Sequence, residues 1–404
     1  NAKAATVTEL EPGTSYEFRV RAKDSNSFSA YTEPVQTRTK DGIIGDLKPA
    51  ISLGTAFDYT VQVSDPGTFG SLSVVGLPSG LTYDPITRKI TGSATAAGPA
   101  SATITATFSD GHTSIRTLTL QVSRLAPPAA APVVAATFTP VNVPVSGTAN
   151  VSVTGKFTDP DTTSAARFVT SLGTFDIILF SNATPLTVDN FLDYIDAGEY
   201  NNTFFHRSPV NFVVQGGGYK YTPADGFTKV AKFPAVLNEP GISNVKGTVA
   251  MAKLGSQPNS ATCEFFVNVA DNSSNLDAQN GGFTVFGRVP DAGMTVLSSI
   301  NALPVGNYDV TIGAETQSLT DVPINAATAP LSLDPANLVK ISSVGAAPIL
   351  VYQVISGNAG VATASLNGTD ITITGVATGS TTIEVKATDL DGKTVTQNIA
   401  VTVP

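Results

Sequence analysis

The sequence predicts a mainly β, multidomain protein, and three observations lead to that prediction. The chain has 404 residues, which at roughly 100 to 200 residues per domain is too long for one hydrophobic core. Only 14% of the residues are charged, and tryptophan is absent. Glycine, proline and serine interrupt short runs of valine, isoleucine and threonine, which is typical of β-sandwich modules with frequent turns.

The charge pattern limits the kinds of molecule that the protein is expected to bind. The formal net charge is -9, and no basic stripe is visible, so we expect no binding to nucleic acid or to an anionic membrane surface. No stretch approaches the ~18 consecutive apolar residues of a membrane-spanning helix. No signal peptide is found either, but we expect the sequence to be a fragment of a longer protein.

Residues 1–41 carry the pattern Leu10-x-x-Gly13-x-x-Tyr16, followed by alternating apolar residues. This resembles the C-terminal part of a fibronectin type III module, in which the tyrosine hydroxyl bonds back to the backbone at a corner. On this resemblance the segment supplies the last three strands of a sandwich. Three strands leave an apolar face bare, so we expect an upstream segment, or another chain through self-assembly, to complete the module.

Residues 42–124 contain a Gly-Leu-Pro-Ser-Gly turn at 76–80 and an alternating run that ends at Asp110-Gly111. This resembles the immunoglobulin-like or cadherin-like repeats of bacterial surface proteins, with Asp-Gly closing a hairpin. We therefore expect an immunoglobulin/cadherin-like β-sandwich. Residues 125–137 follow as a Pro/Ala linker, whose prolines Pro127 and Pro128 favour a semi-rigid, extended spacer.

Two separated segments, 138–165 and 345–404, each resemble part of a cadherin-like repeat. The first contains the start of a repeat without its continuation, and the second supplies strands without a beginning. We predict one split β-sandwich, with residues 166–344 inserted as a separate domain, because loop-closure entropy grows only logarithmically with length. The alternative is two independent modules, with 138–165 an N-terminal extension of the inserted domain.

The inserted domain carries several motifs in a fixed order. They occupy residues 173–180, 184–192, 198–201, 204–207, 215–217, 247–252, 259–268 and 283–289. Together they resemble the cyclophilin-type peptidyl-prolyl cis-trans isomerases, most clearly in Phe-Phe-His-Arg at 204–207 and Gln-Gly-Gly at 215–217. The resemblance implies an eight-stranded antiparallel β-barrel with two helices, a proline-containing polypeptide as substrate, and no cofactor.

The resemblance also implies the site residues. Arg207 would donate a hydrogen bond to the prolyl nitrogen of the twisted amide, and Gln215 would orient both Arg207 and the substrate carbonyl. The backbone of Met251 and Ala252 would hold the peptide as an added edge strand. The remaining substrate-binding residues are Phe212, Val213, Glu264, Phe266, Leu276 and Phe283.

Three residues depart from the family pattern: Lys253, Glu264 and Asn275. Glu264 stands where the family usually has glutamine, so we expect its carboxylate to pair with Arg207 and compete with the prolyl nitrogen. This predicts reduced activity, which Glu264→Gln would raise.

Cysteine, histidine and aspartate add little chemistry. Cys263 is the only cysteine, which excludes an intrachain disulfide, and we expect it to be a buried apolar residue. We expect His206 to be structural, because isomerisation needs no proton transfer, and no metal is expected at the histidines. The pairs Asp159/Asp161 and Asp389/Asp391 are either turn formers or calcium ligands at module junctions.

Two functions from different classes fit the sequence. The first is an extracellular or cell-surface prolyl isomerase, in a bacterial envelope, that acts on Xaa-Pro bonds of exported or surface proteins. The second is a structural extracellular protein, such as a surface layer, fibre or adhesin. In that case the isomerase domain would be a weakly active or inactive peptide-binding module.

Overall fold

A computed structural model describes residues 7–8, 10–23, 27–96, 98–124, 126 and 129–404. The chain falls into two compact units, the first built mainly from residues 1–124 and the second mainly from residues 125–404. Leu125, Pro127 and Pro128 of the predicted linker lie outside the described residues.

The larger part of the first unit is a β-sandwich. One sheet has the order β4 (Ala50–Ser52), β11 (Thr113–Ser123), β10 (Gly98–Phe108), β7 (Phe69–Val75). The second has the order β5 (Phe57–Thr60), β9 (Lys89–Gly92), β8 (Leu81–Asp84), and β3 (Ile43–Ile44) pairs with β6 (Gln62–Val63). Along β10 every second side chain from Ala102 to Phe108 is buried, as a half-buried strand requires. The hairpin expected at Asp110-Gly111 joins β10 to β11.

The N-terminal segment contributes a two-stranded sheet, β1 (Ser15–Phe18) with β2 (Val35–Arg38). The Tyr16 hydroxyl accepts a hydrogen bond from the Glu11 N–H at 2.9 Å, as expected for the tyrosine corner. The prediction of three strands is not met in the described residues. The N–H groups of Val20 and Ala22 donate to the side-chain oxygens of Thr32 and Ser29, and only their carbonyl oxygens take part in backbone pairing with these two residues.

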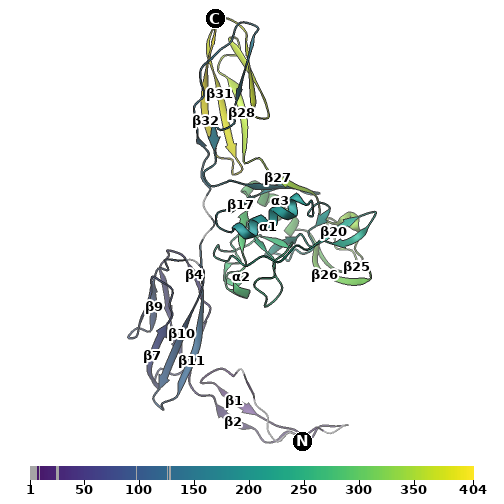
Figure 1. Ribbon diagram of the computed structural model, residues 1–404. Helices are drawn as coiled ribbons and strands as arrows, with labels where there is room; N and C mark the ends of the chain where they lie inside the picture. The colour runs from purple at the N-terminus through teal and green to yellow at the C-terminus, as the bar shows by residue number, and fades with distance from the viewer. Residues whose placement is uncertain (1–6, 9, 24–26, 97, 125, 127–128) are drawn as a thin grey trace. The chain divides into compact units, whose positions relative to one another are not determined.

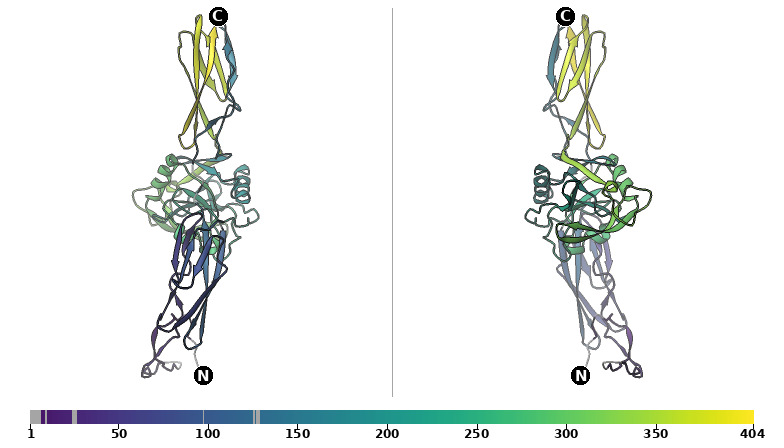
Figure 2. Two further views of the ribbon diagram at one scale, coloured as in Figure 1. Left: turned by 90° about the vertical axis from the view of Figure 1, so that its left-hand side faces the viewer. Right: turned by 90° about the vertical axis from the view of Figure 1, so that its right-hand side faces the viewer.

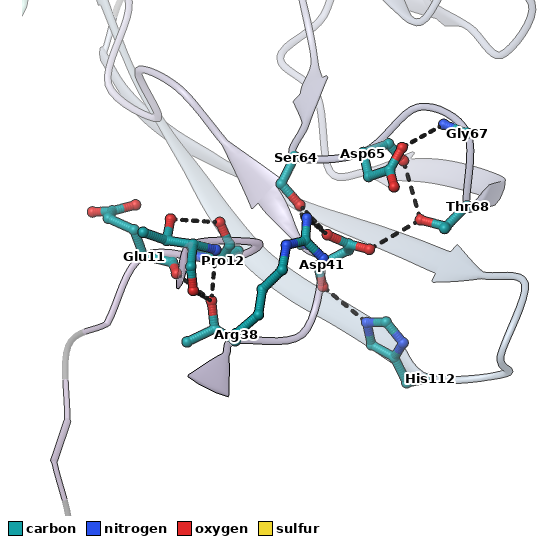
Figure 3. A network of polar contacts seen from close by, with 12 residues as sticks. Glu11, Pro12, Arg38, Asp41, Ser64, Asp65, Gly67, Thr68 and His112 are labelled. Carbon is teal, nitrogen blue, oxygen red and sulfur yellow. Dashed lines mark hydrogen bonds and ion pairs between the residues drawn. The ribbon is translucent and has the colours of Figure 1, made fainter. Parts of the chain in front are cut away.

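Polar contacts around Asp41 join this segment to the sandwich (Figure 3). Its carboxylate accepts from Arg38 at 2.7 Å, from Ser64 at 3.0 Å and from Thr68 at 3.1 Å. The hydrogen bond from Arg38 is the main reason that the pKa of Asp41 lies below its usual value. His112 Nε2 lies 2.8 Å from the Asp41 carbonyl oxygen, so one residue contacts β2, the loop before β7 and the β10–β11 hairpin.

The second unit contains a sandwich built from both ends of its sequence. Its sheets have the orders β13 (Val141–Asn142), β32 (Thr394–Val403), β31 (Gly379–Asp389), β28 (Leu350–Ser356) and β14 (Thr148–Ser152), β30 (Asp370–Gly375), β29 (Ala362–Asn367). Val143 and Val153 pack in one buried cluster with Ile373 and Ile383. Figure 2 shows the blue strand of the 138–165 segment beside the yellow strands of the 345–404 segment. These pairings support the proposal that 138–165 and 345–404 form one split sandwich.

The predicted linker differs from the structure at its C-terminal end. Val133 and Val134 form strand β12 (Val133–Val134), which pairs with β15 (Phe157–Thr158). Phe138 is buried and belongs to the sandwich core. The chain therefore enters the sandwich about four residues before the predicted boundary at 137 because two valines find a strand partner.

The segment that separates the two halves of this sandwich in the sequence forms an antiparallel β-barrel (Figure 1). Its strands, in spatial order, are β19 (Val213–Gly216), β23 (Phe265–Asn268), β22 (Thr248–Met251), β24 (Val285–Arg288), β17 (Gly173–Leu179), β16 (Ala165–Thr170), β27 (Lys340–Ala346) and β18 (Thr203–Phe204). A bridge between Arg207, just past β18, and Gln215 in β19 joins the two ends of this row. The predicted eight-stranded barrel is thereby confirmed, and the closure brings together two candidate site residues.

Two long helices pack on the barrel, α1 (Pro185–Asp196) and α3 (Asp291–Asn301), and α2 (Ser273–Leu276) adds a single turn. Pro185 suits the first position of α1 because its missing N–H would have no partner there. The next two N–H groups, of Leu186 and Thr187, donate to the Glu239 carboxylate. Phe191 of α1 is fully buried and contacts the rings of Phe168, Tyr200, Phe265 and Phe286.

Two hairpins extend the barrel. The first, β20 (Tyr219–Thr222) with β21 (Gly226–Lys229), pairs with β18, and the second is β25 (Val305–Ile312) with β26 (Glu315–Pro323). Phe204, Tyr308 and Leu319 are among the residues that form a small apolar cluster between them. Among the described residues, no helix is long and apolar enough to cross a membrane.

Candidate active site

Arg207, Gln215 and Phe266 lie in one row across adjacent strands. The backbone pairs Arg207 with Gln215, and Gln215 with Phe266. Directly opposed residues in antiparallel strands project their side chains to the same face. The Arg207 Nη1 donates to Gln215 Oε1 at 3.4 Å. The two residues predicted to be catalytic are therefore brought together.

Three glycines after Gln215 allow this row to approach its neighbours. A Cβ at Gly216 would lie 3.1 Å from the Phe205 ring, and one at Gly217 would lie 2.5 Å from the Cys263 carbonyl oxygen. Gly217 also has a φ of +82°, which favours glycine. A Cβ at Gly218 would lie 2.9 Å from Glu264 Oε1. Larger residues here would push the 263–264 segment away from β19.

Apolar side chains border the row. The guanidinium of Arg207 lies 5.9 Å from the centre of the Phe212 ring. Phe266 and Phe283 meet edge to face, with 5.7 Å between ring centres. Val213 and Phe266 are 2% and 5% exposed, so both give most of their surface to the protein interior. Leu276 is buried in α2.

Sequence reasoning missed the residues that anchor the loop from 208 to 212. Asn272 Nδ2 donates to the Phe212 carbonyl oxygen at 2.9 Å, and Asn301 Nδ2 donates to Ser208 Oγ and to the Pro209 carbonyl oxygen. Both asparagines are buried, which is unusual for this residue type unless it is fully hydrogen-bonded.

The expected pairing of Glu264 with Arg207 is wrong. Among the described residues no ion pair joins these two side chains. Glu264 Oε2 instead accepts from Gln215 Nε2 at 2.8 Å and lies 3.3 Å from His206 Nε2. Burial by itself would raise the pKa of Glu264, but His206, Gln215 and Lys232 outweigh burial and lower it. The glutamine amide thus stands between the carboxylate and the guanidinium.

The expected edge strand at Met251 and Ala252 also differs from the structure. Strand β22 lies between β23 and β24. The N–H of Met251 donates to the backbone carbonyl oxygen of Thr284, and the N–H of Ala252 donates to the backbone carbonyl oxygen of Glu264. These two donors are therefore not available to a peptide. Lys253 is the first residue beyond them; its Nζ lies 4.7 Å from the centre of the Phe283 ring, and burial lowers its pKa to about 8.

Cys263 and His206 are both buried, the first as predicted. The Tyr200 hydroxyl donates to the Cys263 carbonyl oxygen at 2.9 Å, and burial raises the pKa of the Cys263 thiol. His206 lies edge to face with Tyr219, with 4.9 Å between ring centres. The structural role expected for His206 is thus accompanied by a contact with Glu264.

The aspartates at the ends of the split sandwich form turns and ion pairs. Asp159 Oδ1 accepts from the N–H groups of Asp161 and Thr162, and burial raises its pKa to about 6. Asp391 pairs through both oxygens with Arg288, which also lies 3.7 Å from Asp161. In the part of the chain that the structure describes, no group of three or more His, Cys, Asp or Glu side chains could hold a metal ion.

Comparisons with known proteins agree with this geometry. Residues 165–328 match the family model for cyclophilin type peptidyl-prolyl cis-trans isomerase/CLD, and residues 45–123 match that for a putative Ig domain. The fibronectin type III assignment of residues 1–41 stays a prediction.

Individual relatives align over the barrel. The peptidyl-prolyl cis-trans isomerase of Acinetobacter baylyi is 39% identical over 140 residues, which are 34% of this chain and 72% of that protein. Peptidyl-prolyl cis-trans isomerase B of Escherichia coli is 41% identical over 145 residues, which are 34% of this chain and 85% of that protein. Peptidyl-prolyl cis-trans isomerase A of Dickeya dadantii is 38% identical over 149 residues, which are 36% of this chain and 75% of that protein. The chain therefore belongs to the cyclophilin-type peptidyl-prolyl cis-trans isomerases, through a barrel that it carries in addition to an Ig-like domain.

Proposed function

We propose that the chain isomerises Xaa-Pro bonds in exported or surface polypeptides, with Arg207 as the catalytic residue. The observation that carries the proposal is the row of Arg207, Gln215 and Phe266 at the closure of the barrel, with Phe212 beside the guanidinium. A proline ring on the aromatic side chains would bring its nitrogen toward Arg207.

The chemistry needs no covalent step. Rotation about the amide bond must overcome about 18 to 20 kcal/mol, because resonance is lost in the twisted state. In that state the prolyl nitrogen regains a lone pair, which can accept a hydrogen bond. A guanidinium has five N–H donors, and Gln215 uses one of them, so others remain for the substrate. A donor that binds only the twisted state lowers the barrier.

An exported location is supported by the domains around the barrel. The Ig-like domain and the split sandwich resemble modules of bacterial surface proteins, and Cys263, the only cysteine, is buried and so protected from oxidation. Substrates in such a location would be extended, proline-containing chains that have crossed a membrane unfolded.

A structural role is the second candidate function, and exposed apolar residues favour it. Val20, Phe28, Tyr31 and Val35 are each at least half exposed around the two-stranded sheet β1–β2. We propose that an upstream segment or another copy of the chain covers them. In that case the barrel would be a side domain of a larger assembly of chains.

The test is the cis-to-trans isomerisation of a short Ala-Pro reporter peptide by the wild-type chain and by Arg207→Ala. We expect activity in the wild type and at least a ~100-fold lower kcat/KM in the variant. Arg116→Ala is the matched control, because Arg116 is an exposed arginine of the Ig-like domain. A wild-type chain without activity that forms ordered assemblies would favour the structural role.

A further inference from the structure

A continuous series of polar contacts runs from His206 to Arg207 through two other side chains. His206 Nε2 lies 3.3 Å from Glu264 Oε2, and the same oxygen accepts from Gln215 Nε2 at 2.8 Å. Gln215 Oε1 in turn accepts from Arg207 Nη1. Each end of the Gln215 amide is thus in contact with a charged or titratable partner.

The carboxylate determines which way the Gln215 amide faces. An ionised carboxylate only accepts hydrogen bonds, so the NH₂ group of Gln215 must face Glu264 and its oxygen must face Arg207. The pKa of Glu264 is lowered, despite burial, by His206, Gln215 and Lys232, which keeps it ionised near neutral pH. A glutamine at position 264 could donate or accept, and would leave both orientations of Gln215 available.

The fourth side chain of this series is the His206 imidazole, which is neutral or positively charged depending on whether it holds a second proton. His206 is 6% exposed, and its Nδ1 atom is buried with no hydrogen-bond partner among the described residues. Its other nitrogen faces the Glu264 carboxylate. Imidazole is the side chain that ordinarily changes charge between pH 5 and 8. A protonated ring cancels the charge of Glu264, whereas a neutral ring leaves it uncompensated.

We propose that Glu264 is a positioning residue that holds the Gln215 amide toward Arg207, and that protonation of His206 raises isomerase activity. This inference rests on the proposed function of Arg207. With His206 neutral, the carboxylate lies one side chain from the guanidinium and weakens its attraction for the prolyl lone pair. The kcat/KM therefore falls by about three- to ten-fold as the imidazole loses its proton.

The other groups around Glu264 hold their charge between pH 5.5 and 7.5. Tyr219 on β20 lies against the imidazole, and burial raises its pKa; burial likewise raises that of Cys263. Lys232, which precedes β22 in the sequence, also lowers the pKa of Glu264. Lys253, beside Phe283, has a pKa of about 8 and keeps most of its charge up to pH 7.5.

The experiment measures kcat/KM for the Ala-Pro reporter at several values between pH 5.5 and 7.5, with the full chain. The chain has two histidines, so His112→Gln in the Ig-like domain is the matched control. The variants are Glu264→Gln and His206→Gln, each checked for folding by circular dichroism. A parallel titration follows the His206 ring nitrogens by NMR in the wild type and in Glu264→Gln.

The expected result is a falling profile in the wild type and in His112→Gln, and a flat one in His206→Gln, whose side chain takes up no proton. The NMR titration of His206 should differ between the wild type and Glu264→Gln, because the carboxylate lies 3.3 Å from His206 Nε2. A profile that stays equally steep in His206→Gln, or a flat profile in an active wild type, overturns the inference. Absence of activity at every pH overturns the proposed function instead, and the NMR titration still tests the His206–Glu264 pair.

Discussion

Gly218→Ala tests the position of Glu264 without removing any chemical group. The added Cβ would lie 2.9 Å from Glu264 Oε1 and 3.0 Å from its Cδ. To restore an ordinary contact of about 3.5 Å, the carboxylate must retreat by roughly 0.6 Å. That displacement stretches its 2.8 Å bond from Gln215 to the edge of hydrogen-bonding distance.

A hydrogen bond to a charged group contributes about 1.5 to 3 kcal/mol. If the loss of this hydrogen bond weakens the interaction of Arg207 with the twisted amide by about 1 kcal/mol, kcat/KM falls about five-fold. The reporter assay measures this fall, and thermal unfolding shows whether the barrel is intact.

Gly345→Ala is the matched control, because it lies in strand β27 of the same barrel and a Cβ there meets nothing within 4 Å. We expect its kcat/KM to equal that of the wild type. Should both alanine variants retain full activity with unchanged stability, the position of Glu264 has no bearing on catalysis and the reasoning fails.

Three further predictions concern the split sandwich. Val153→Ala should lower the free energy of hydrogen-exchange protection at the Ile373 amide by about 2 kcal/mol, because both residues are fully buried in one core. Unchanged protection would contradict a shared sandwich. Asp391→Asn should cost about 3 kcal/mol of unfolding free energy, because it leaves Arg288 without its two-oxygen partner, and a smaller loss in the Arg288→Met, Asp391→Asn double variant would confirm the coupling. Burial raises the pKa of Asp159 to about 6, so the folded state holds a proton that the unfolded chain releases near pH 4. The free energy of unfolding therefore falls as the pH rises from about 4 to 6. Asp159→Asn should remove this pH dependence, measured as the change of hydrogen-exchange protection with pH.

The parts of the fold that could be predicted from the sequence were those that depend on local pattern. Tyr16 lies in a short motif whose hydrogen bond to the Glu11 N–H forms within six residues. Arg207 and Gln215 were expected to act together because of the resemblance to the cyclophilin family, and the loop from 208 to 212 returns the chain so that the two residues pair at the barrel closure. The split sandwich followed from two incomplete strand sets, each of which leaves apolar residues that need partners.

The parts that could not be predicted depend on contacts between distant segments. The partner of Glu264 was wrong because the space left by Gly218 and the orientation of Gln215 decide which side chain reaches the carboxylate. The donors of Met251 and Ala252 were expected at an edge, but β22 lies inside the sheet. The side-chain oxygens of Thr32 and Ser29, which accept from Val20 and Ala22, leave no periodic signal in the sequence.

The central claim is that an Arg207 N–H donates to the twisted prolyl amide, rather than merely closing the barrel. The most direct measurement compares reporter isomerisation by Arg207→Lys and Arg207→Ala, with equal folding shown by circular dichroism. A lysine keeps the charge and a donor but loses the planar fork that Gln215 aligns, so we predict intermediate activity, about ten-fold below wild type, and almost none with alanine. Equal activity of wild type and Arg207→Ala would contradict the account.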